Sequence, residues 1–215
     1  MKKEILLLAK SPKNLKLCVV GLDLETGTFV RLLSKIGSEL MPNHLRCSNG
    51  IDAEVLDVVE VDFLAPAPSF CHQEDWRINT DIPFKYLCPF GVNDLKGILS
   101  TDPFIFGNTN YALSLGEAKV VTKSILLVKI TDIQNTISVS LTTRKIRNKL
   151  FFNYKGRAYA DFAITDFKYR HSRSKISYKE ALAVMTLANP IDTYSQEHGL
   201  CYKFIAQLFP LDDPM

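Results

Sequence analysis

The chain has 215 residues, 47% of them hydrophobic and 23% charged, with a formal net charge of +3. This composition is typical of a globular protein that forms one large domain or two small ones. No run approaches the roughly 18–20 apolar residues of a membrane span. The apolar stretch at residues 5–9 is also shorter than the roughly 7–15 residues of a signal-peptide core. We therefore expect a cytoplasmic protein with no membrane partner, whose N-terminus forms a buried strand.

The cysteines favour reduced thiols over a disulfide framework, because five of them, an odd number, are scattered along the chain. His44 precedes Cys47, and His198 precedes Cys201, by the same spacing, with Cys71-His72 between the two pairs. These residues raise the hypothesis of a zinc site. No CxxC motif accompanies them, and Cys201 stands in a strand-like run, so we expect no metal and no cofactor.

The first third of the chain predicts β-strands. Residues 3–9 are apolar and end in a cluster of turn residues, and residues 18–34 predict two strands joined at Glu25-Thr26-Gly27. Gly27 can take the positive φ that a tight hairpin requires. Arg31 shares a face of the return strand with apolar residues, so it needs a partner. Two interpretations stay open: a salt bridge or loop carbonyl within the fold, or a contact with a phosphate or carboxylate ligand.

The middle of the chain is less regular. Valine density favours a strand within residues 52–64, and residues 71–81 place the single tryptophan, Trp76, among polar neighbours. Residues 82–116 contain several Pro and Gly residues and predict a connector with short elements.

From residue 118 onward the β pattern returns. Strands are predicted at residues 120–130, 137–142, 149–154, 157–164 and 200–209. Residues 178–188 have helix propensity, yet their position between strand runs also suits a buried strand. Short strands separated by Gly, Pro and Asn predict an all-β protein of barrels or sandwiches. Residues 5–10 and 125–130 are alike, which suggests two copies of one small β unit.

The order and spacing of several stretches resemble the dual OB-containing domain family, a bacterial group with two predicted OB-fold barrels in tandem. The stretches are residues 5–11, 18–23, 26–34, 56–61, 66–68, 72–76, 159–166 and 201–206. The resemblance implies an all-β fold of two OB-like barrels at residues 1–97 and 118–215, with an irregular connector at 98–117. It also implies nucleic-acid binding, linked to mobile-element or anti-phage defence. Phe29 and Asp75 depart from the family pattern, which has an aromatic residue, often tryptophan, at the first place and an amide at the second.

Positive charge is concentrated in one part of the chain. Residues 141–179 contain 11 Lys and Arg against two Asp, a net charge of +9, so the remainder carries −6. Such asymmetry favours a polyanionic ligand over a merely solvated surface. An OB barrel binds single strands through cations that follow the phosphates and aromatic rings that stack on bases.

Basic and aromatic residues are interleaved in this region, as single-stranded DNA or RNA binding requires. We expect at least one of Phe151 and Phe152 in the core and the side chains of Tyr154 and Tyr169 in solvent. The predicted nucleic-acid-binding residues are Arg144, Lys145, Arg147, Lys149, Tyr154, Lys168, Tyr169, Arg170, Arg173, Lys175 and Lys203.

Three further residues are candidates for a ligand site or an interface: Arg31, Trp76 and Asp166. Asp166 follows an apolar strand, and it could organise the basic loop after it by accepting hydrogen bonds. We expect a binding protein without catalytic residues, because no Walker A, Gly-x-Ser-x-Gly or His-Glu-x-x-His motif occurs. Two alternatives remain: a metal-dependent nuclease or phosphodiesterase, and an adaptor whose acidic first barrel binds a protein partner.

Overall fold

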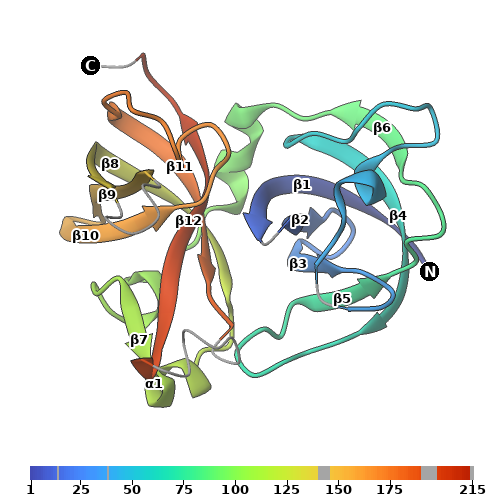
Figure 1. Ribbon diagram of the computed structural model, residues 1–215, viewed down its shortest axis with the longest axis horizontal. Helices are drawn as coiled ribbons and strands as arrows, with labels where there is room; N and C mark the ends of the chain where they lie inside the picture. Colours follow the sequence, from blue (N-terminus) through green and yellow to red (C-terminus); the bar gives the residue numbers. More distant parts are fainter. Residues whose placement is uncertain (14, 38, 140–145, 190–197, 214–215) are drawn as a thin grey trace. The chain divides into compact units, whose positions relative to one another are not determined.

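The computed structural model describes residues 1–13, 15–37, 39–139, 146–189 and 198–213 (Figure 1). Contacts divide the chain into two compact units. The first contains Met1–Ser69 and Gln73–Ile98, and the second contains Phe70–His72 and Leu99–Met215. Residues 99–117, which the sequence predicts as connector, thus belong to the second unit.

The first unit is a closed five-stranded barrel. Its strands are β1 (Lys2–Lys13), β2 (Lys16–Asp23), β3 (Thr28–Leu33), β4 (Asp57–Pro66) and β5 (Asp75–Ile78), and β6 (Lys85–Pro89) adds to β4. Antiparallel pairing joins β1 to β2, β2 to β3, β5 to β4, and β4 back to β1. β3 and β5 pair in parallel. Two 3-10 helices, η1 (Pro42–Leu45) and η2 (Val92–Ile98), lie in the connections.

The predicted hairpin between β2 and β3 is confirmed. Gly27 has φ +68°, and its N–H donates to the carbonyl oxygen of Asp23 at 2.8 Å. The Asp23 carboxylate accepts a hydrogen bond from the backbone N–H of Glu25 at 3.0 Å. Gly27 is needed because a side chain is strained at this positive φ.

The second unit repeats the same strand order. Its barrel strands are β8 (Ile125–Val139), β9 (Ile146–Tyr154), β10 (Arg157–Ile164), β11 (Ser177–Leu187) and β12 (Leu200–Pro210). Antiparallel pairs join β8 to β9, β9 to β10, β12 to β11, and β11 back to β8. β10 and β12 pair in parallel. The elements η3 (Ile105–Gly107), β7 (Ala112–Ser114) and α1 (Leu115–Lys119) precede the barrel, and β7 adds to β12.

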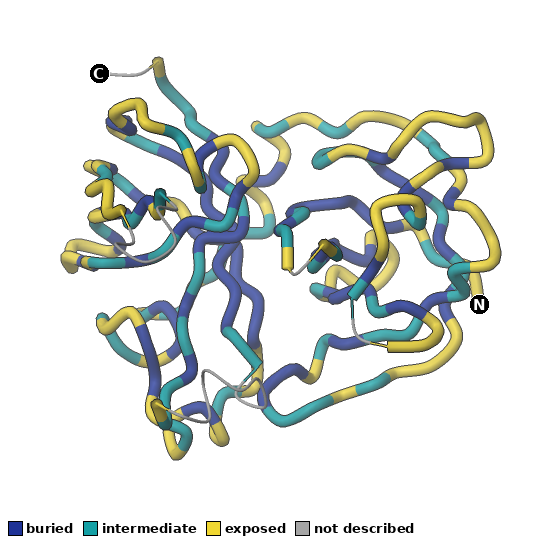
Figure 2. The backbone as a smooth tube through the Cα atoms, viewed as in Figure 1, coloured by how far each residue is buried: buried dark blue, intermediate teal, exposed yellow. Residues whose placement is uncertain are grey.

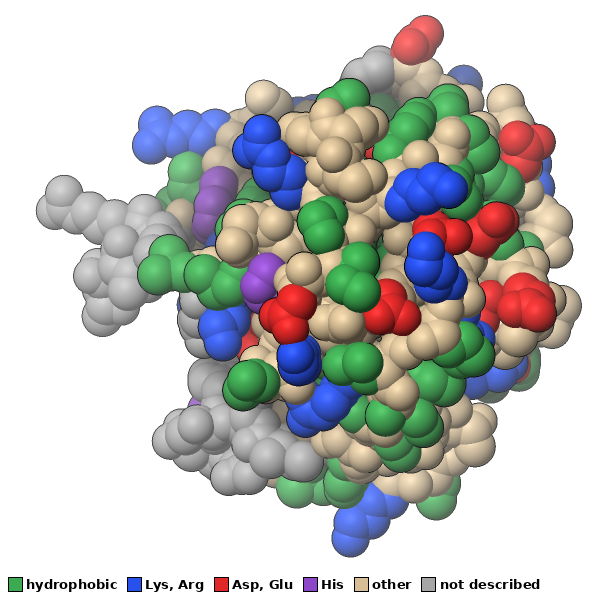
Figure 3. All heavy atoms as spheres, turned by 90° about the vertical axis from the view of Figure 1, so that its right-hand side faces the viewer, with side chains coloured by type: hydrophobic (Ala, Val, Ile, Leu, Met, Phe, Trp, Pro, Cys, Tyr) green, Lys and Arg blue, Asp and Glu red, His purple; other side chains and the backbone are tan. Residues whose placement is uncertain are grey.

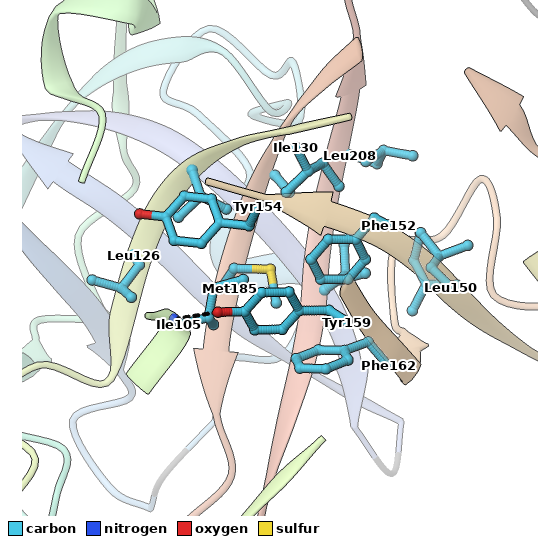
Figure 4. Close-up of a cluster of buried hydrophobic side chains, with 14 of the residues drawn as sticks. Ile105, Leu126, Ile130, Leu150, Phe152, Tyr154, Tyr159, Phe162, Met185 and Leu208 are labelled. Atoms are coloured by element: carbon cyan, nitrogen blue, oxygen red, sulfur yellow. Dashed lines mark hydrogen bonds between the residues drawn. The ribbon is translucent and has the colours of Figure 1, made fainter. Parts of the chain in front are cut away.

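Each barrel has its own hydrophobic core, and the buried residues follow the strands in Figure 2. In the second unit the rings of Phe152, Tyr159 and Phe162 pack together, with centroids 5.2–5.7 Å apart. Figure 4 shows this cluster and the hydrogen bond that the backbone N–H of Ile105 donates to the Tyr159 hydroxyl, 3.3 Å long. The all-β prediction with two small barrels is confirmed.

Two local predictions are resolved by tertiary context. Residues 178–187 lie in strand β11 rather than in a helix, because β11 pairs with β8 on one side and β12 on the other. Tertiary pairing here outweighs helix propensity. Strands are predicted separately at 120–130 and 137–142, but residues 125–130 and 137–139 lie in one strand, because β8 continues without a break from Ile125 to Val139. Residues 140–142 lie outside the described residues.

Arg31 of β3 and Asp75 of β5 form a buried ion pair across the parallel strands that close the first barrel. The Arg31 Nη1 atom lies 2.6 Å from Asp75 Oδ1, and the two residues are 5% and 3% exposed. They are also register partners. Of the two interpretations of Arg31, the structure supports the salt bridge within the fold. Its burial corrects its assignment as a candidate ligand contact.

Replacing Asp75 removes the carboxylate that neutralises Arg31, and the loss of one partner of a buried pair destabilises a protein by about 3–5 kcal/mol. We expect Asp75→Ala to lower the free energy of unfolding by an amount in this range, measured by urea denaturation. Glu25→Ala, at an exposed position of the hairpin, is the control and should change it by less than about 0.5 kcal/mol. Equal effects of the two variants would contradict a role of the pair in closing the barrel.

Candidate nucleic-acid interface

The residues of β9 alternate between the core and the solvent. Asn148, Leu150, Phe152 and Tyr154 are at most 3% exposed. The side chains between them therefore point outward: Arg147, Lys149, Phe151 and Asn153. Phe151 is 37% exposed and Phe152 is 3% exposed, so one of these two phenylalanines packs in the core, as the sequence predicts.

β10 and β12 continue this surface with small and aromatic side chains. Ala163 of β10 is the register partner of Lys149 on one side and of Phe204 on the other. Because register partners share a face of the sheet, Lys149 and Phe204 flank a single methyl group. We call this surface the outer face. It consists of Arg147, Lys149, Phe151, Ala158, Ala160, Ala163, Tyr202 and Phe204.

At the outer face, the cation of Lys149 lies close to two tyrosine rings. The Lys149 Nζ atom lies 3.6 Å from Asp161 Oδ1 and 6.0 Å from the centre of the Tyr111 ring. The Tyr111 ring is nearly parallel to that of Tyr202, with an interplanar angle of 17° and centroids 6.2 Å apart. Tyr111 is 43% exposed. The sequence pattern missed Tyr111 because this residue precedes the barrel in a region without strand periodicity.

The basic loop, residues 165–176, follows β10 and is anchored by buried polar side chains. The Asp166 carboxylate accepts hydrogen bonds from the backbone N–H groups of Lys168 (2.8 Å) and Leu208 (3.0 Å) and from Gln207 Nε2 (2.7 Å). Burial raises the pKa of Asp166. Asp166 thus fixes the start of the loop to β12. The backbone hydrogen bonds agree with the prediction that Asp166 organises the loop, and the side-chain donor is Gln207 where the sequence predicts an arginine.

Asn148 anchors the other side of the basic loop. Its Nδ2 atom donates to the carbonyl oxygens of Tyr169 and Ser172 at 2.6 and 2.8 Å. Its Oδ1 atom accepts a hydrogen bond of 2.8 Å from Asn135 of β8. The ring of His171 forms a hydrogen bond of 2.7 Å with the carbonyl oxygen of Ile146. The backbone of the loop is therefore held to β8 and β9, while the side chains of Lys168, Arg173 and Lys175 are exposed to solvent.

The structure exposes some of the predicted binding residues. Arg147, Lys168, Arg173 and Lys175 are exposed, and none of them forms a salt bridge in the part of the chain that the structure describes. Lys149 and Arg170 are half-buried, and burial lowers the pKa of Arg170. Arg144 and Lys145 lie outside the described residues.

Three predicted binding residues are buried instead, which corrects their assignment. Tyr154 and Tyr169 are 2% and 5% exposed. The Tyr154 hydroxyl donates to the carbonyl oxygen of Asp102 at 2.6 Å, and the hydroxyls of Tyr169 and Tyr178 are 3.2 Å apart. Figure 4 shows Tyr154 among the core side chains. Tyr154 faces inward from β9 and Tyr169 is buried at the base of the basic loop, so neither ring is available to stack on a base.

Lys203 is 1% exposed and anchors the segment before β7. Its ammonium group donates to the carbonyl oxygens of Ile105 and Asn108, at 2.7 and 2.9 Å, and to Asn108 Oδ1 at 2.7 Å. Burial lowers the pKa of Lys203 to about 7. The lysine predicted to face a groove is therefore a support for residues 105–108 within the second unit.

The first unit presents a different surface. Val20 and Leu22 of β2 and Arg31 of β3 are all at most 5% exposed. Trp76 is half-buried, with its ring 5.5 Å from that of Phe63 and 5.4 Å from Lys3 Nζ. The side chains of β2 and β3 thus offer no exposed cationic row like that of β9, and Trp76 packs beside the core.

The charges of the two units also differ. The first unit has 11 Lys and Arg against 13 Asp and Glu, and the second has 15 against 10. Many cations of the first unit are ion-paired, including Lys2 with Glu60, Lys10 with Glu54 and Lys35 with Asp81. Figure 3 shows a face on which basic and acidic side chains are interspersed. An unbalanced positive charge is therefore a property of the second unit.

A pocket of about 470 Å³ opens in the second unit. Its walls are mainly apolar and include Phe104, Phe106 and Leu126. One cation, Lys123, lines it together with the carboxylates of Asp102 and Glu117. This balance of charge is unsuited to a polyanion, so the outer face and the basic loop are the stronger candidate site.

Within the described ranges, no three His, Cys, Asp or Glu side chains gather to hold a metal ion. His44 instead accepts a hydrogen bond from the backbone N–H of Met41 at 3.2 Å. The Cys201 thiol donates to the carbonyl oxygen of Ala188 at 2.8 Å.

No helix among the described residues has the length and apolar character of a membrane span.

The strand order of each barrel, with one parallel pair closing it, defines a protein of two OB-folds. A family model described as a dual OB-containing domain matches residues 3–208. The chain belongs to this family. No curated protein and no solved structure is significantly similar to it.

Asn148→Ala should lower the free energy of unfolding by about 1–3 kcal/mol, because two buried carbonyl oxygens and one amide lose their partner. Urea denaturation measures the change. Asn153→Ala is the matched control, since the amide of Asn153 forms an exposed hydrogen bond with Asp132. A loss no larger than that of the control would show that Asn148 does not anchor the basic loop.

Lys203 should make stability depend on pH. The folded-state pKa of about 7 lies below the ordinary value of 10.5, so the unfolded chain binds this proton first as the pH falls. The contribution of Lys203 to the free energy of unfolding therefore rises between pH 7 and pH 10. We expect the wild type to gain stability over this window relative to Lys203→Met, measured by thermal unfolding of both proteins. A constant difference between them would contradict a lowered pKa.

Proposed function

We propose that the protein binds single-stranded DNA or RNA through the outer face and the basic loop of the second barrel. The observation that carries this proposal is a group of exposed cations that form no salt bridge within the described residues. Arg147 projects from β9, and Lys168, Arg173 and Lys175 project from the anchored loop beside it. Cations in such an arrangement bind successive phosphates of a strand.

The shape and composition of the outer face favour a single strand over a duplex. Phe151 presents an exposed ring, and Ala158, Ala160 and Ala163 keep β10 free of bulky side chains. Exposed rings stack on unpaired bases, whereas the bases of a duplex are already stacked on each other. OB-folds use the face of their second and third strands, here β9 and β10, for oligonucleotides.

The proposal describes binding without catalysis, which agrees with the absence of a recognised catalytic motif in the sequence. A role in mobile-element or anti-phage defence enters this proposal only through the family resemblance.

Removing two exposed cations should reduce the salt dependence of binding. For single strands, each phosphate contact contributes about 0.7 to the slope of log K against log salt concentration. We expect Arg147→Ala/Arg173→Ala to weaken binding and to reduce the slope by about 1.4. Fluorescence anisotropy with a labelled single-stranded oligonucleotide over a salt series measures both quantities.

The charge-matched control is Lys85→Ala/Lys96→Ala, which removes two exposed cations of the first unit and should leave the slope unchanged. An unlabelled duplex of the same length should compete poorly with the single strand. Absence of binding at low salt, or an equal effect of the two double variants, would refute the proposed interface.

A further inference from the structure

We infer that Tyr111 and Tyr202 form a stacking platform for one unpaired base of the bound strand, with Lys149 contacting the adjacent phosphate. This inference rests on the proposed function and assigns a subsite within it. Tyr111 is not a residue of the five barrel strands. It precedes β7, the short strand that adds to β12.

The platform is fixed by contacts made in the absence of any ligand. The backbone N–H of Lys203 donates to the carbonyl oxygen of Tyr111 at 2.9 Å. Ala112, the next residue, is the register partner of Tyr202. The ammonium group of Lys203 holds Ile105 and Asn108 just upstream. The backbone that carries both rings is therefore anchored, which reduces the entropy that a ligand must lose on binding.

The nearest charge defines the chemistry of the ligand. Lys149 Nζ lies 6.0 Å from the centre of the Tyr111 ring, so a cation lies next to an aromatic ring. The two rings are stacked at 17° with centroids 6.2 Å apart, so each ring holds the other in its orientation. An unpaired nucleotide has a planar base that can stack on a ring and a phosphate that can contact a cation, so it matches both the tyrosine rings and Lys149.

The Lys149–Asp161 distance of 3.6 Å leaves the ammonium group in a weak, half-exposed ion pair. Pairs of this kind contribute little to stability, so a phosphate can replace the carboxylate as the partner of Lys149 at little cost. Ala163 is the register partner of both Lys149 and Phe204, so the outer face continues from Lys149 across β10 to β12.

The test compares two labelled 12-mers with equal numbers of phosphates: oligo(dT) and an abasic strand that lacks bases. Anisotropy at one salt concentration should show that the wild type binds oligo(dT) roughly tenfold or more tightly than the abasic strand, as expected for stacking. Tyr111→Ala/Tyr202→Ala should lose most of this preference and keep its affinity for the abasic strand.

The matched control is Tyr111→Phe/Tyr202→Phe, which keeps both rings and should keep the preference. Circular dichroism shows whether the double variant folds. If it does not fold, Tyr111→Ala alone replaces it in the test, because Tyr111 is exposed and lies outside the core. If the alanine variants bind oligo(dT) as tightly as the wild type, the platform is refuted and the proposed function stands. If the wild type binds neither strand at low salt, both are refuted.

Discussion

Both barrels depend on the short parallel strand pair that closes them. In each unit the third and fifth barrel strands share only two or three register pairs, fewer than the antiparallel pairs of the first and second barrel strands. A buried carboxylate reinforces each closure. Asp75 binds Arg31 across β3 and β5, and Asp166 binds the backbone and Gln207 of β12 just beyond the end of β10. Buried carboxylates are costly unless they are paired or hydrogen-bonded, so these partners are required by the fold.

The closure of the second barrel also positions the candidate site. Asp166 ends the contact between β10 and β12 and begins the basic loop, so one side chain both closes the barrel and fixes the loop. Lys203 plays a similar role on β12, where it supports residues 105–108 and, through its backbone, Tyr111. The buried polar side chains of Asp166 and Lys203 thus hold the backbone that carries exposed residues of the candidate site. They do not themselves face a ligand.

Much of the fold could be predicted from the sequence, whereas the orientation of single side chains often could not. The hairpin at Gly27 and the strand at 157–164 follow from local signals of turn chemistry and alternation. Tyr154 and Tyr169 were predicted in solvent because they stand among basic residues. The orientation of Tyr154 depends on the phase of β9, and that of Tyr169 on the fold of the basic loop. The interleaving of aromatic and basic residues in the sequence reveals neither. Tyr111 carries no local signal, since only the pairing of β7 with β12 brings it to Tyr202.

The way in which each barrel closes has a consequence for how the chain folds. Lys2 lies opposite Asp62, and Ile125 lies opposite Thr186, so the strand that begins each barrel pairs with one formed much later in the sequence. Contacts between residues so distant in sequence require a large loss of chain entropy before they contribute any stability, and proteins rich in them fold slowly. Each barrel is therefore expected to fold slowly. Until the later strand forms, one edge of the first strand remains unpaired.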